Sequence, residues 1–482
     1  MADEHRMFIA GVWTGSQSGA TFEATSPSTG EVIGTLPEGT REDVRLAVRA
    51  AADAFGTWSR LTAFDRAAAM RRVAEAIDRR REEMANTLAL DQGKPKRAEA
   101  FDEVEELIAY FEMAAADAVR VEGLIPPSVT QGNRVLVYRV PRGVAGVISP
   151  WNWPYTMPGE IVAPALASGN TVVLAPAPTT SVCGVALAEA IAEADLPPGT
   201  FNLVTGPGAV VGDEVASNPR VSTVGFIGSS ATGHRVAERA AGKELLLEMG
   251  GNGPLVVLED ADLDAAVEAT LTACFLNAGQ SCTAGERVLV QEGVHDAYIG
   301  KLTAAIAERI RLGDPFDDAT TMGPLNNAGV VDKTERHVTE AIELGASIVT
   351  GGKRAPQFGS DLFFEATVVD GVTEEMQIAR EETFGPVVPV ETIGHEDEAI
   401  AFVDGSEHGL LSSIFTADIG RGLRFAERVR TGWVNVNEGT NYWESHLPFG
   451  GRAGSASGVG RVGGRFSIER LTELKTIVVH LG

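Results

Sequence analysis

Apolar residues recur at helical spacing early in the chain. Within residues 41–85, positions such as Val44 and Val48 repeat as they would along one face of a helix, which predicts helical structure. Thr40 and Asp43 stand three positions apart where this pattern begins, the spacing of a capping box in which two side chains accept hydrogen bonds at a helix start. We therefore expect helical structure to begin directly after Thr40.

From about Val144 the pattern changes to short, continuous apolar runs. These runs alternate with helix-like segments such as 181–194, and they cover residues 143–148, 171–175, 201–204 and 223–227. Continuous apolar strands that alternate with helices are typical of a parallel sheet buried on both faces. The pattern therefore predicts a nucleotide-binding α/β domain.

A second α/β series follows toward the carboxyl end. Its expected helices are 263–276, 295–311 and 329–345, and its expected strands lie near residues 288, 347 and 387. The Gly-rich segment Leu245–Pro254 separates the two series, and we expect it to be the hinge between two units.

Two strand-like runs lie outside both series. They are residues 134–140, which follow the loop GLIPPS, and the carboxyl-terminal run KTIVVHLG. An unpaired strand presents free N–H and C=O groups and must pair with something to avoid aggregation. We therefore predict a small β ribbon that serves oligomerisation, in a homodimer or a homotetramer.

Size and charge narrow the function. A chain of 482 residues is too long for one hydrophobic core, so two large domains are expected. The formal net charge of −26 argues against nucleic acid and anionic membranes as partners. The start MADEHRMFIAGVW lacks the pattern of a signal peptide, and no run of about 18 apolar residues follows, so we expect a cytoplasmic protein.

The cysteines raise the first question of chemistry. Cys183, Cys274 and Cys282 are odd in number, and their spacings suit neither a disulfide framework nor a metal site, so no metal is expected. Cys282 lies in LNAGQSCTAGERV, between a helical pattern and a β-branched run. Taken alone, that stretch fits a buried spectator as well as a nucleophile.

Four further motifs carry candidate chemistry. VGFIGSSATGHRV places Gly228 and Gly233 between a strand and a helix, where they form either an anion-binding loop or a simple turn. ISPWNWPYTMP places Asn152 after the first parallel strand, as a turn residue or as an amide donor. LLLEMGGNGP holds Glu248 in apolar company, which raises a carboxyl pKa and suits a general base, although a surface ion pair is the alternative. REETFGPVVPV adds Glu382 and Phe384.

In combination these motifs resemble those of the aldehyde dehydrogenase superfamily, over nearly the whole chain. PWNWP, FIGSSATG, LEMGGN, GQSC, EETFGPV, GWVNVN and PFGG follow in the order of the family and at about its spacing. The resemblance implies an α/β fold with a Rossmann-like cofactor domain, a second α/β catalytic domain and a small β oligomerisation ribbon. The implied bounds are 1–121 and 142–248 for the NAD-binding domain, 249–445 for the catalytic domain, and 122–141 with 446–482 for the oligomerisation and bridging segment.

The resemblance also implies a reaction, the NAD(P)-dependent oxidation of an aldehyde to a carboxylic acid. Cys282 attacks the aldehyde to give a thiohemiacetal, and the Asn152 amide and the Cys282 backbone N–H hold the oxyanion. Glu248 then activates water to hydrolyse the thioester. The implied cofactor-binding residues are Ser149, Trp151, Gly228, Ser229, Gly233, Glu382 and Phe384.

The sequence departs from the family pattern at several positions. Ala175 stands where a lysine usually reaches an adenosine ribose hydroxyl, and Pro178 where a glutamate is common. Without that lysine a 2′-phosphate loses its cation, so NAD is expected as cofactor, with NADP possible. Ile161 replaces a second lysine near the base, beside Glu160, and Ile227 replaces a frequent threonine.

The resemblance places a set of mostly aromatic residues along the aldehyde tunnel. They are Trp153, Tyr155, Met157, Glu160, Tyr442 and Trp443, and core packing is the alternative for the aromatic ones. Glu160, Glu438 and Glu444 are expected to make the entrance acidic. The hypothesis is that neutral, aromatic or amine-bearing aldehydes are preferred over semialdehydes that carry a carboxylate.

Two other functions remain open. A CoA-acylating dehydrogenase uses thiolysis in place of hydrolysis and generally lacks the base, so the presence of Glu248 argues against it. A non-catalytic binding or structural protein on the same fold is the second alternative, and the presence of Cys282, Asn152 and Glu248 together argues against it.

Overall fold

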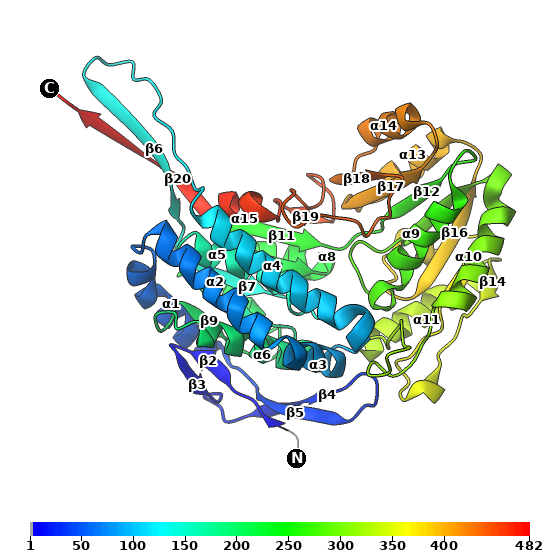
Figure 1. Ribbon diagram of the computed structural model, residues 1–482, viewed down its shortest axis with the longest axis horizontal. Helices are drawn as coiled ribbons and strands as arrows, with labels where there is room; N and C mark the ends of the chain where they lie inside the picture. Colours follow the sequence, from blue (N-terminus) through cyan, green and yellow to red (C-terminus); the bar gives the residue numbers. More distant parts are fainter. Residues whose placement is uncertain (1–2) are drawn as a thin grey trace.

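Two sheets, each covered by helices on both faces, account for most of the computed structural model, which describes residues 3–482 (Figure 1). Within that range the first sheet has eight strands in the order β19-β11-β10-β7-β8-β9-β2-β3. The second sheet has seven, in the order β14-β15-β16-β13-β12-β17-β18. The mixed α/β class with parallel sheets is confirmed.

The first sheet has a parallel centre formed by the predicted apolar runs. Its strands are β7 (Val144–Ile148), β8 (Thr171–Ala175), β9 (Phe201–Leu203), β10 (Val221–Gly228) and β11 (Glu244–Met249). Antiparallel strands extend both edges: β19 (Gly458–Val459) beside β11, and β2 (Met7–Ile9) with β3 (Val12–Thr14) beyond β9. The strand order reverses between β7 and β10, and ligands of open α/β sheets bind outside the carboxyl ends of strands at such a point.

The alternation along β8 explains why its sequence is apolar without interruption. Val172 and Leu174 pack into one core, whereas Val173 and Ala175 pack into another on the opposite face. The first core includes residues of α4 (Phe101–Ala118), α5 (Thr156–Ala167) and α6 (Ser181–Glu193), and the second includes residues of α1 (Arg41–Trp58), α7 (Val211–Ser217) and α8 (Ser230–Arg239). Both faces are thus removed from water, as a parallel sheet requires.

The helical segment predicted over 41–85 is divided in the structure. It comprises α1, then α2 (Ala63–Arg79), then α3 (Arg81–Asp91). The capping box at Thr40 and Asp43 is confirmed, and a second one at Thr62 and Asp65 restarts the chain as α2. None of the helices within residues 3–482 is both long and apolar enough to cross a membrane.

The second sheet is parallel except at one edge. Its strands are β12 (Pro254–Val257), β13 (Arg287–Gln291), antiparallel β14 (Ser347–Thr350), β15 (Thr367–Asp370), β16 (Val387–Ile393), β17 (Leu411–Phe415) and β18 (Trp433–Val436). Its helices are α9 (Leu263–Phe275), α10 (His295–Arg309), α11 (Ala328–Glu343), α12 (Gln377–Arg380), α13 (Glu396–Gly405) and α14 (Ile419–Arg428). The three helices expected in this series are confirmed within two residues at each end.

The hinge predicted over Leu245–Pro254 is wrong for most of its length. Residues 244–249 form β11, which pairs in continuous register with β10, because the run LLLEM is apolar enough to be an inner strand of the first sheet. The crossing to the second sheet is confined to residues 250–253, before β12 begins.

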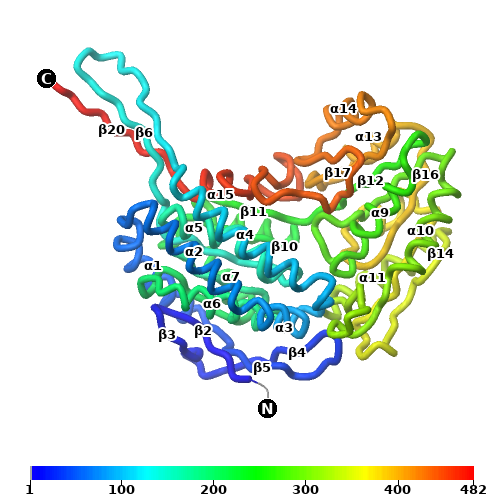
Figure 2. Tube along the Cα trace, in the orientation of Figure 1, coloured from blue at the N-terminus to red at the C-terminus, as the bar shows by residue number. Residues whose placement is uncertain are grey.

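The two outlying strands pair with each other. β6 (Asn133–Pro141) and β20 (Thr472–His480) form an antiparallel ribbon that projects from the body (Figures 1 and 2). The remainder of the carboxyl-terminal segment lies on the first unit, since β19 joins its sheet and α15 (Gly464–Leu471) contacts α4 and α5. A small sheet of β1 (Asp3–Glu4), β4 (Thr21–Thr25) and β5 (Val32–Pro37) lies near the amino end.

Candidate active site

The loop that carries Cys282 begins with a left-handed turn. After α9 ends, Asn277, Ala278 and Gly279 have φ angles of 52°, 53° and 73°. A left-handed conformation costs a residue with a side chain about 1–2 kcal/mol, so two of these three positions are strained. The loop therefore needs support from its surroundings.

Buried hydrogen bonds hold this turn. The Asn277 backbone N–H donates to both carboxylate oxygens of Glu99 at 3.1 Å, and the Gln92 amide donates to the Asn277 side-chain oxygen at 2.9 Å. The Asn277 amide donates to the Asn152 carbonyl at 2.9 Å, and the Asn152 amide donates to the Gln280 carbonyl at 3.1 Å. Asn152 and the cysteine loop are thus fixed to each other.

Two glycines let neighbouring segments approach the loop closely. A Cβ added to Gly251 would lie 2.3 Å from the Cys282 carbonyl oxygen, and one added to Gly279 would lie 2.1 Å from the Gly385 carbonyl oxygen. Any side chain at either position is therefore excluded. The close approach brings the end of β11, with Glu248, and the segment around Glu382 against the cysteine loop.

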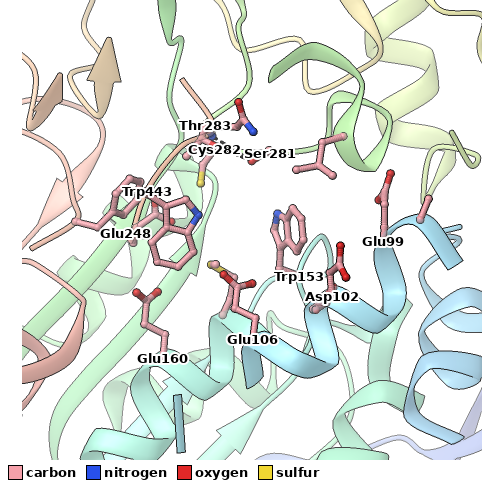
Figure 3. A pocket seen from close by; sticks show the side chains of 16 residues that line it. Glu99, Asp102, Glu106, Trp153, Glu160, Glu248, Ser281, Cys282, Thr283 and Trp443 are labelled. Carbon is pink, nitrogen blue, oxygen red and sulfur yellow. Dashed lines mark hydrogen bonds between the residues drawn. The ribbon is translucent and has the colours of Figure 1, made fainter. Parts of the chain in front are cut away.

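Two cavities meet at Cys282. One has a volume of about 330 Å³ and the other about 140 Å³. Met157, Glu248 and Cys282 line both of them. In Figure 3 the Cys282 thiol points into the larger cavity, and the carboxyl groups of Glu106 and Glu160 extend from other parts of its wall.

The smaller cavity lies at the carboxyl ends of β7 and β10, where the strand order of the first sheet reverses. Its walls include Trp151, Asn152, Gly228, Ser229, Glu382 and Phe384. Two residues expected to bind cofactor are placed elsewhere. The Ser149 N–H donates to the Ala175 carbonyl at 3.1 Å, and Gly233 packs within α8 so closely that an added Cβ would lie 2.0 Å from the Met249 sulfur.

Glu382 and Phe384 are held by hydrogen bonds and ring contacts. The Glu286 carboxylate accepts the backbone N–H groups of Thr383 and Phe384, both at 2.8 Å. Glu382 accepts the Gly251 N–H at 3.0 Å, and Phe384 meets Trp151 edge-on, with ring centres 5.4 Å apart. Burial raises the pKa of Glu382 to about 7, against the opposing charge of Lys333.

Burial also raises the pKa values of Glu248 and Cys282. It raises the pKa of the Glu248 carboxyl to about 8. It raises the pKa of the Cys282 thiol well above its usual value, and the charges of Glu248, Glu382 and Glu160 add to that shift. A raised pKa favours the protonated form of each group. One carboxyl oxygen of Glu248 is buried without a hydrogen-bond partner within residues 3–482.

The larger cavity has aromatic and acidic walls. Its lining comprises Trp153, Met157, Trp443 and Phe449, the acids Glu99, Asp102, Glu103, Glu106, Glu160 and Glu248, and Ala98, Leu276, Ser281, Cys282, Thr283 and Asn441. Four residues expected along the aldehyde tunnel, Trp153, Met157, Glu160 and Trp443, therefore lie together here.

Two expected tunnel residues lie elsewhere, and the reason is geometric. Met157 and Glu160 are three positions apart on one face of α5, whereas Tyr155 precedes the helix and is buried, with its hydroxyl donating to the Met84 carbonyl at 3.2 Å. Tyr442 and Glu438 line a surface hollow that shares Asn441 and Trp443 with the larger cavity. Glu438 and Glu444, expected to make the entrance acidic, are not among the residues that line the larger cavity.

The sequence interpretation missed several wall residues. Glu99 lies in the π-helical segment η1 (Lys96–Ala100), and Asp102 and Glu106 follow on α4 at a spacing that returns to the same helix face. That spacing is visible in the sequence, but an acidic stripe on a helix is usually a solvated face. Lys333 of α11, which lines the smaller cavity, was also missed, because a charged residue on a helix usually lies on a solvated face.

The three positions that depart from the family pattern, Ile161, Ala175 and Pro178, have distinct environments. Ile161 packs against β10, where an added Cβ on Gly225 would lie 2.8 Å from it. Ala175 is buried at the end of β8, and Pro178 begins an exposed turn, η2 (Pro178–Thr180).

In the part of the chain from 3 to 482, no group of three or more His, Cys, Asp or Glu side chains is arranged to hold a metal ion.

We expect iodoacetamide to alkylate Cys282 in the native protein and to spare Cys183 and Cys274, which are fully buried. The rate should rise with pH, because a raised thiol pKa leaves little thiolate at pH 7. Peptide mass spectrometry after timed labelling measures both effects. Equal labelling of the three cysteines would contradict this assignment.

Comparisons with known proteins agree with this site. The model of the Aldehyde dehydrogenase family matches residues 13–477. Glutarate-semialdehyde dehydrogenase of Pseudomonas aeruginosa is 38% identical over 470 residues, which cover 97% of this chain and 96% of that protein. Betaine aldehyde dehydrogenase of Bacillus subtilis is also 38% identical, over 98% of this chain and 96% of that protein.

A solved structure extends the similarity to three dimensions. The crystal structure of an NAD-dependent aldehyde dehydrogenase from Sinorhizobium meliloti superimposes with a TM-score of 0.96 at 38% identity, and the match covers 100% of this chain and 96% of that one. The resemblance inferred from the motifs is confirmed, and the chain belongs to the aldehyde dehydrogenase family.

Proposed function

We propose that this protein oxidises an aldehyde to a carboxylic acid, with Cys282 as nucleophile and a nicotinamide cofactor as hydride acceptor. The observation that carries the proposal is that one thiol is shared by two cavities. An aldehyde in the larger cavity and a cofactor in the smaller one would reach Cys282 from different sides. The names of the relatives support aldehyde oxidation; most of them name an aldehyde that carries an anionic group, and betaine aldehyde, which is cationic, is named for the Bacillus subtilis protein.

In the first step the Cys282 thiol loses its proton to solvent, and the thiolate sulfur attacks the aldehyde carbon; the C–S bond forms as the carbonyl π bond breaks, which leaves negative charge on the oxygen. Two donors are available for this oxygen. The Cys282 backbone N–H donates to no acceptor within the described part of the chain, and the Asn152 amide uses one of its two N–H groups on Gln280. Donors held in place before charge develops stabilise the oxyanion without reorganisation.

The smaller cavity fits a nicotinamide cofactor. Glu382 accepts one backbone N–H with one of its carboxylate oxygens, which leaves the other to accept a ribose hydroxyl. Trp151 and Phe384 offer ring surfaces, and Gly228 and Ser229 lie where α8 begins, a position that favours an anionic phosphate. A nicotinamide cofactor held by these residues would supply the hydride acceptor that converts the thiohemiacetal on Cys282 to a thioester.

Glu248 is proposed to complete the reaction. Glu248 lines both cavities, and its carboxyl group, in the ionised form, can accept a proton from water. The water oxygen then attacks the thioester carbon, the C–S bond breaks, and the carboxylic acid is released. A pKa of about 8 lets Glu248 exchange protons near neutral pH.

Glu248→Gln should separate acylation from hydrolysis. We expect a burst of about one NADH per active site, followed by a steady rate lowered by roughly 10²-fold or more, because the amide cannot accept the proton. In the unsubstituted enzyme kcat should rise as pH rises through about 8, where Glu248 loses its proton, and the variant should lack this rise. Stopped-flow absorbance measures both.

Other outcomes of that experiment favour different functions. A requirement for CoA in steady turnover would favour the acylating alternative. Unchanged steady turnover in Glu248→Gln would contradict the assigned role of this residue. Cys282→Ala serves as the control, because it removes the nucleophile and should abolish the burst as well.

NAD is proposed as the preferred cofactor. Ala175 offers no charge to a ribose 2′-phosphate, and Lys333 is the one cationic residue that lines the smaller cavity within residues 3–482. Calorimetric titration should therefore give tighter binding of NAD than of NADP. Tighter binding of NADP would contradict the proposal, and binding of neither would favour the non-catalytic alternative.

The domain assignment is proposed on the observed sheets, with the first sheet binding cofactor and the second carrying Cys282. We further propose that the β6–β20 ribbon joins copies of the chain as a homodimer or homotetramer. Its outward side chains include Leu474 and Val478, which are 62% and 58% exposed. The cytoplasmic location stays a prediction.

Replacing both Leu474 and Val478 with lysine should yield a monomer in light scattering, because charge on an apolar contact opposes its burial. Val12→Lys is the matched control, since Val12 is also 62% exposed but lies on β3, far along the chain from the ribbon. An unchanged mass for the double variant would contradict the proposal.

A further inference from the structure

Apart from the Cys282 thiol, the ionisable side chains that line the larger cavity are all carboxylic acids. Six of its lining residues are carboxylic acids. Within residues 3–482, no lysine, arginine or histidine lines this cavity. Asp102 is exposed and Glu106 is partly exposed, whereas the other four are buried, and burying an unpaired carboxylate is costly. The question is which of these acids already have partners inside the protein.

Two of the acids are used by the fold. Glu103 forms a buried ion pair with Lys94 and also accepts the backbone N–H groups of Tyr155 and Thr156, at 2.9 and 3.3 Å. Glu99 accepts the Asn277 N–H that holds the cysteine loop. Glu103 is therefore paired with a cation, and Glu99 is held by a backbone hydrogen bond although burial raises its pKa to about 7.

Three acids have no cationic partner, and we call Asp102, Glu106 and Glu160 the acidic wall. None of the three forms an ion pair within residues 3–482, although Glu160 accepts the Tyr110 hydroxyl at 3.3 Å. Glu160 is only 2% exposed. Burial and the charge of Glu103 raise the pKa of Glu106 to about 7, against the opposing charge of Lys94, and burial with the charges of Glu248 and Glu106 raises the pKa of Glu160 well above its usual value. A bound cation would offset this cost.

The aromatic side chains that line the cavity also favour a cationic ligand. Trp153, Trp443 and Phe449 present rings to the cavity. A cation is attracted to the face of such a ring. The protein already uses this contact, because the Lys94 ammonium lies 3.0 Å from the centre of the Trp153 ring.

We propose that the substrate is an aldehyde that carries an ammonium or quaternary ammonium group, with its aldehyde at Cys282 and its cation beside Glu106 and Glu160. This inference rests on the proposed function and names its substrate class. It narrows the hypothesis drawn from the sequence, which included neutral and aromatic aldehydes. It also changes the acids involved, because α4 supplies them in place of Glu438 and Glu444.

Three probes separate charge from shape. 4-Trimethylammoniobutanal carries a fixed cation, 5,5-dimethylhexanal has the same shape without charge, and succinate semialdehyde carries an anion. Their kcat/KM values are measured with saturating NAD, and with NADP if it binds more tightly. We expect kcat/KM for the cation to exceed that for its neutral counterpart by about tenfold or more, and the anion to be the poorest.

Variants test whether the acidic wall causes the preference for the cationic probe. Glu106→Gln and Glu160→Gln should each reduce the ratio of kcat/KM between the cationic and neutral probes by about threefold to tenfold, mainly through KM for the cation. Glu112→Gln is the matched control, because Glu112 lies on the same helix, α4, but is exposed. It should leave the ratio unchanged.

The outcomes distinguish this inference from the proposed function. Equal or higher kcat/KM for the neutral or anionic probe overturns the inference while aldehyde oxidation stands. A cation preference that survives both wall variants overturns the assignment to Glu106 and Glu160. Failure to oxidise any probe, in protein whose Cys282 still alkylates, overturns the proposed function and the inference with it.

Discussion

The left-handed turn at residues 277–279 is the constraint on which the site depends. Asn277 and Ala278 are strained, and the strain persists because buried groups from other segments hold the turn. Glu99 provides two of these contacts and also borders the larger cavity. Asn152 receives one contact and faces the smaller cavity. The position of Cys282 is therefore tied to both cavities through one hydrogen-bond network.

The carboxyl groups around this network determine its electrostatics. Lys94 and Glu103 form a buried pair, which balances one negative charge with a cation inside the protein. The other acids near Cys282 lack such a partner, and desolvation is the first cause of the raised pKa values of Glu248, Glu382 and Glu160. Groups with pKa values near neutrality can take up and release protons under ordinary conditions. The acidic composition of the chain thus extends into its interior.

Position 161 supplies no cation to this balance, because it holds isoleucine. Ile161 packs against β10, so no cation from that position reaches the site. Its neighbour Glu160 adds a further carboxyl group, and its charge is among the causes that raise the pKa of Cys282. Glu382, Phe384 and Ser229, directly before α8, line the smaller cavity, whereas Ala175 and Pro178 do not.

The sequence by itself determined the local structure and the order of the motifs. The run at 171–175 coincides with β8, because an apolar strand buried on both faces has a continuous pattern, and Thr40 with Asp43 specified the start of α1. Tertiary structure alone decided that β6 pairs with β20, hundreds of residues away, and that Glu106 faces a cavity. The reason is physical: periodicity identifies the apolar face of an element, but what lies against its polar face depends on contacts between residues distant in the chain.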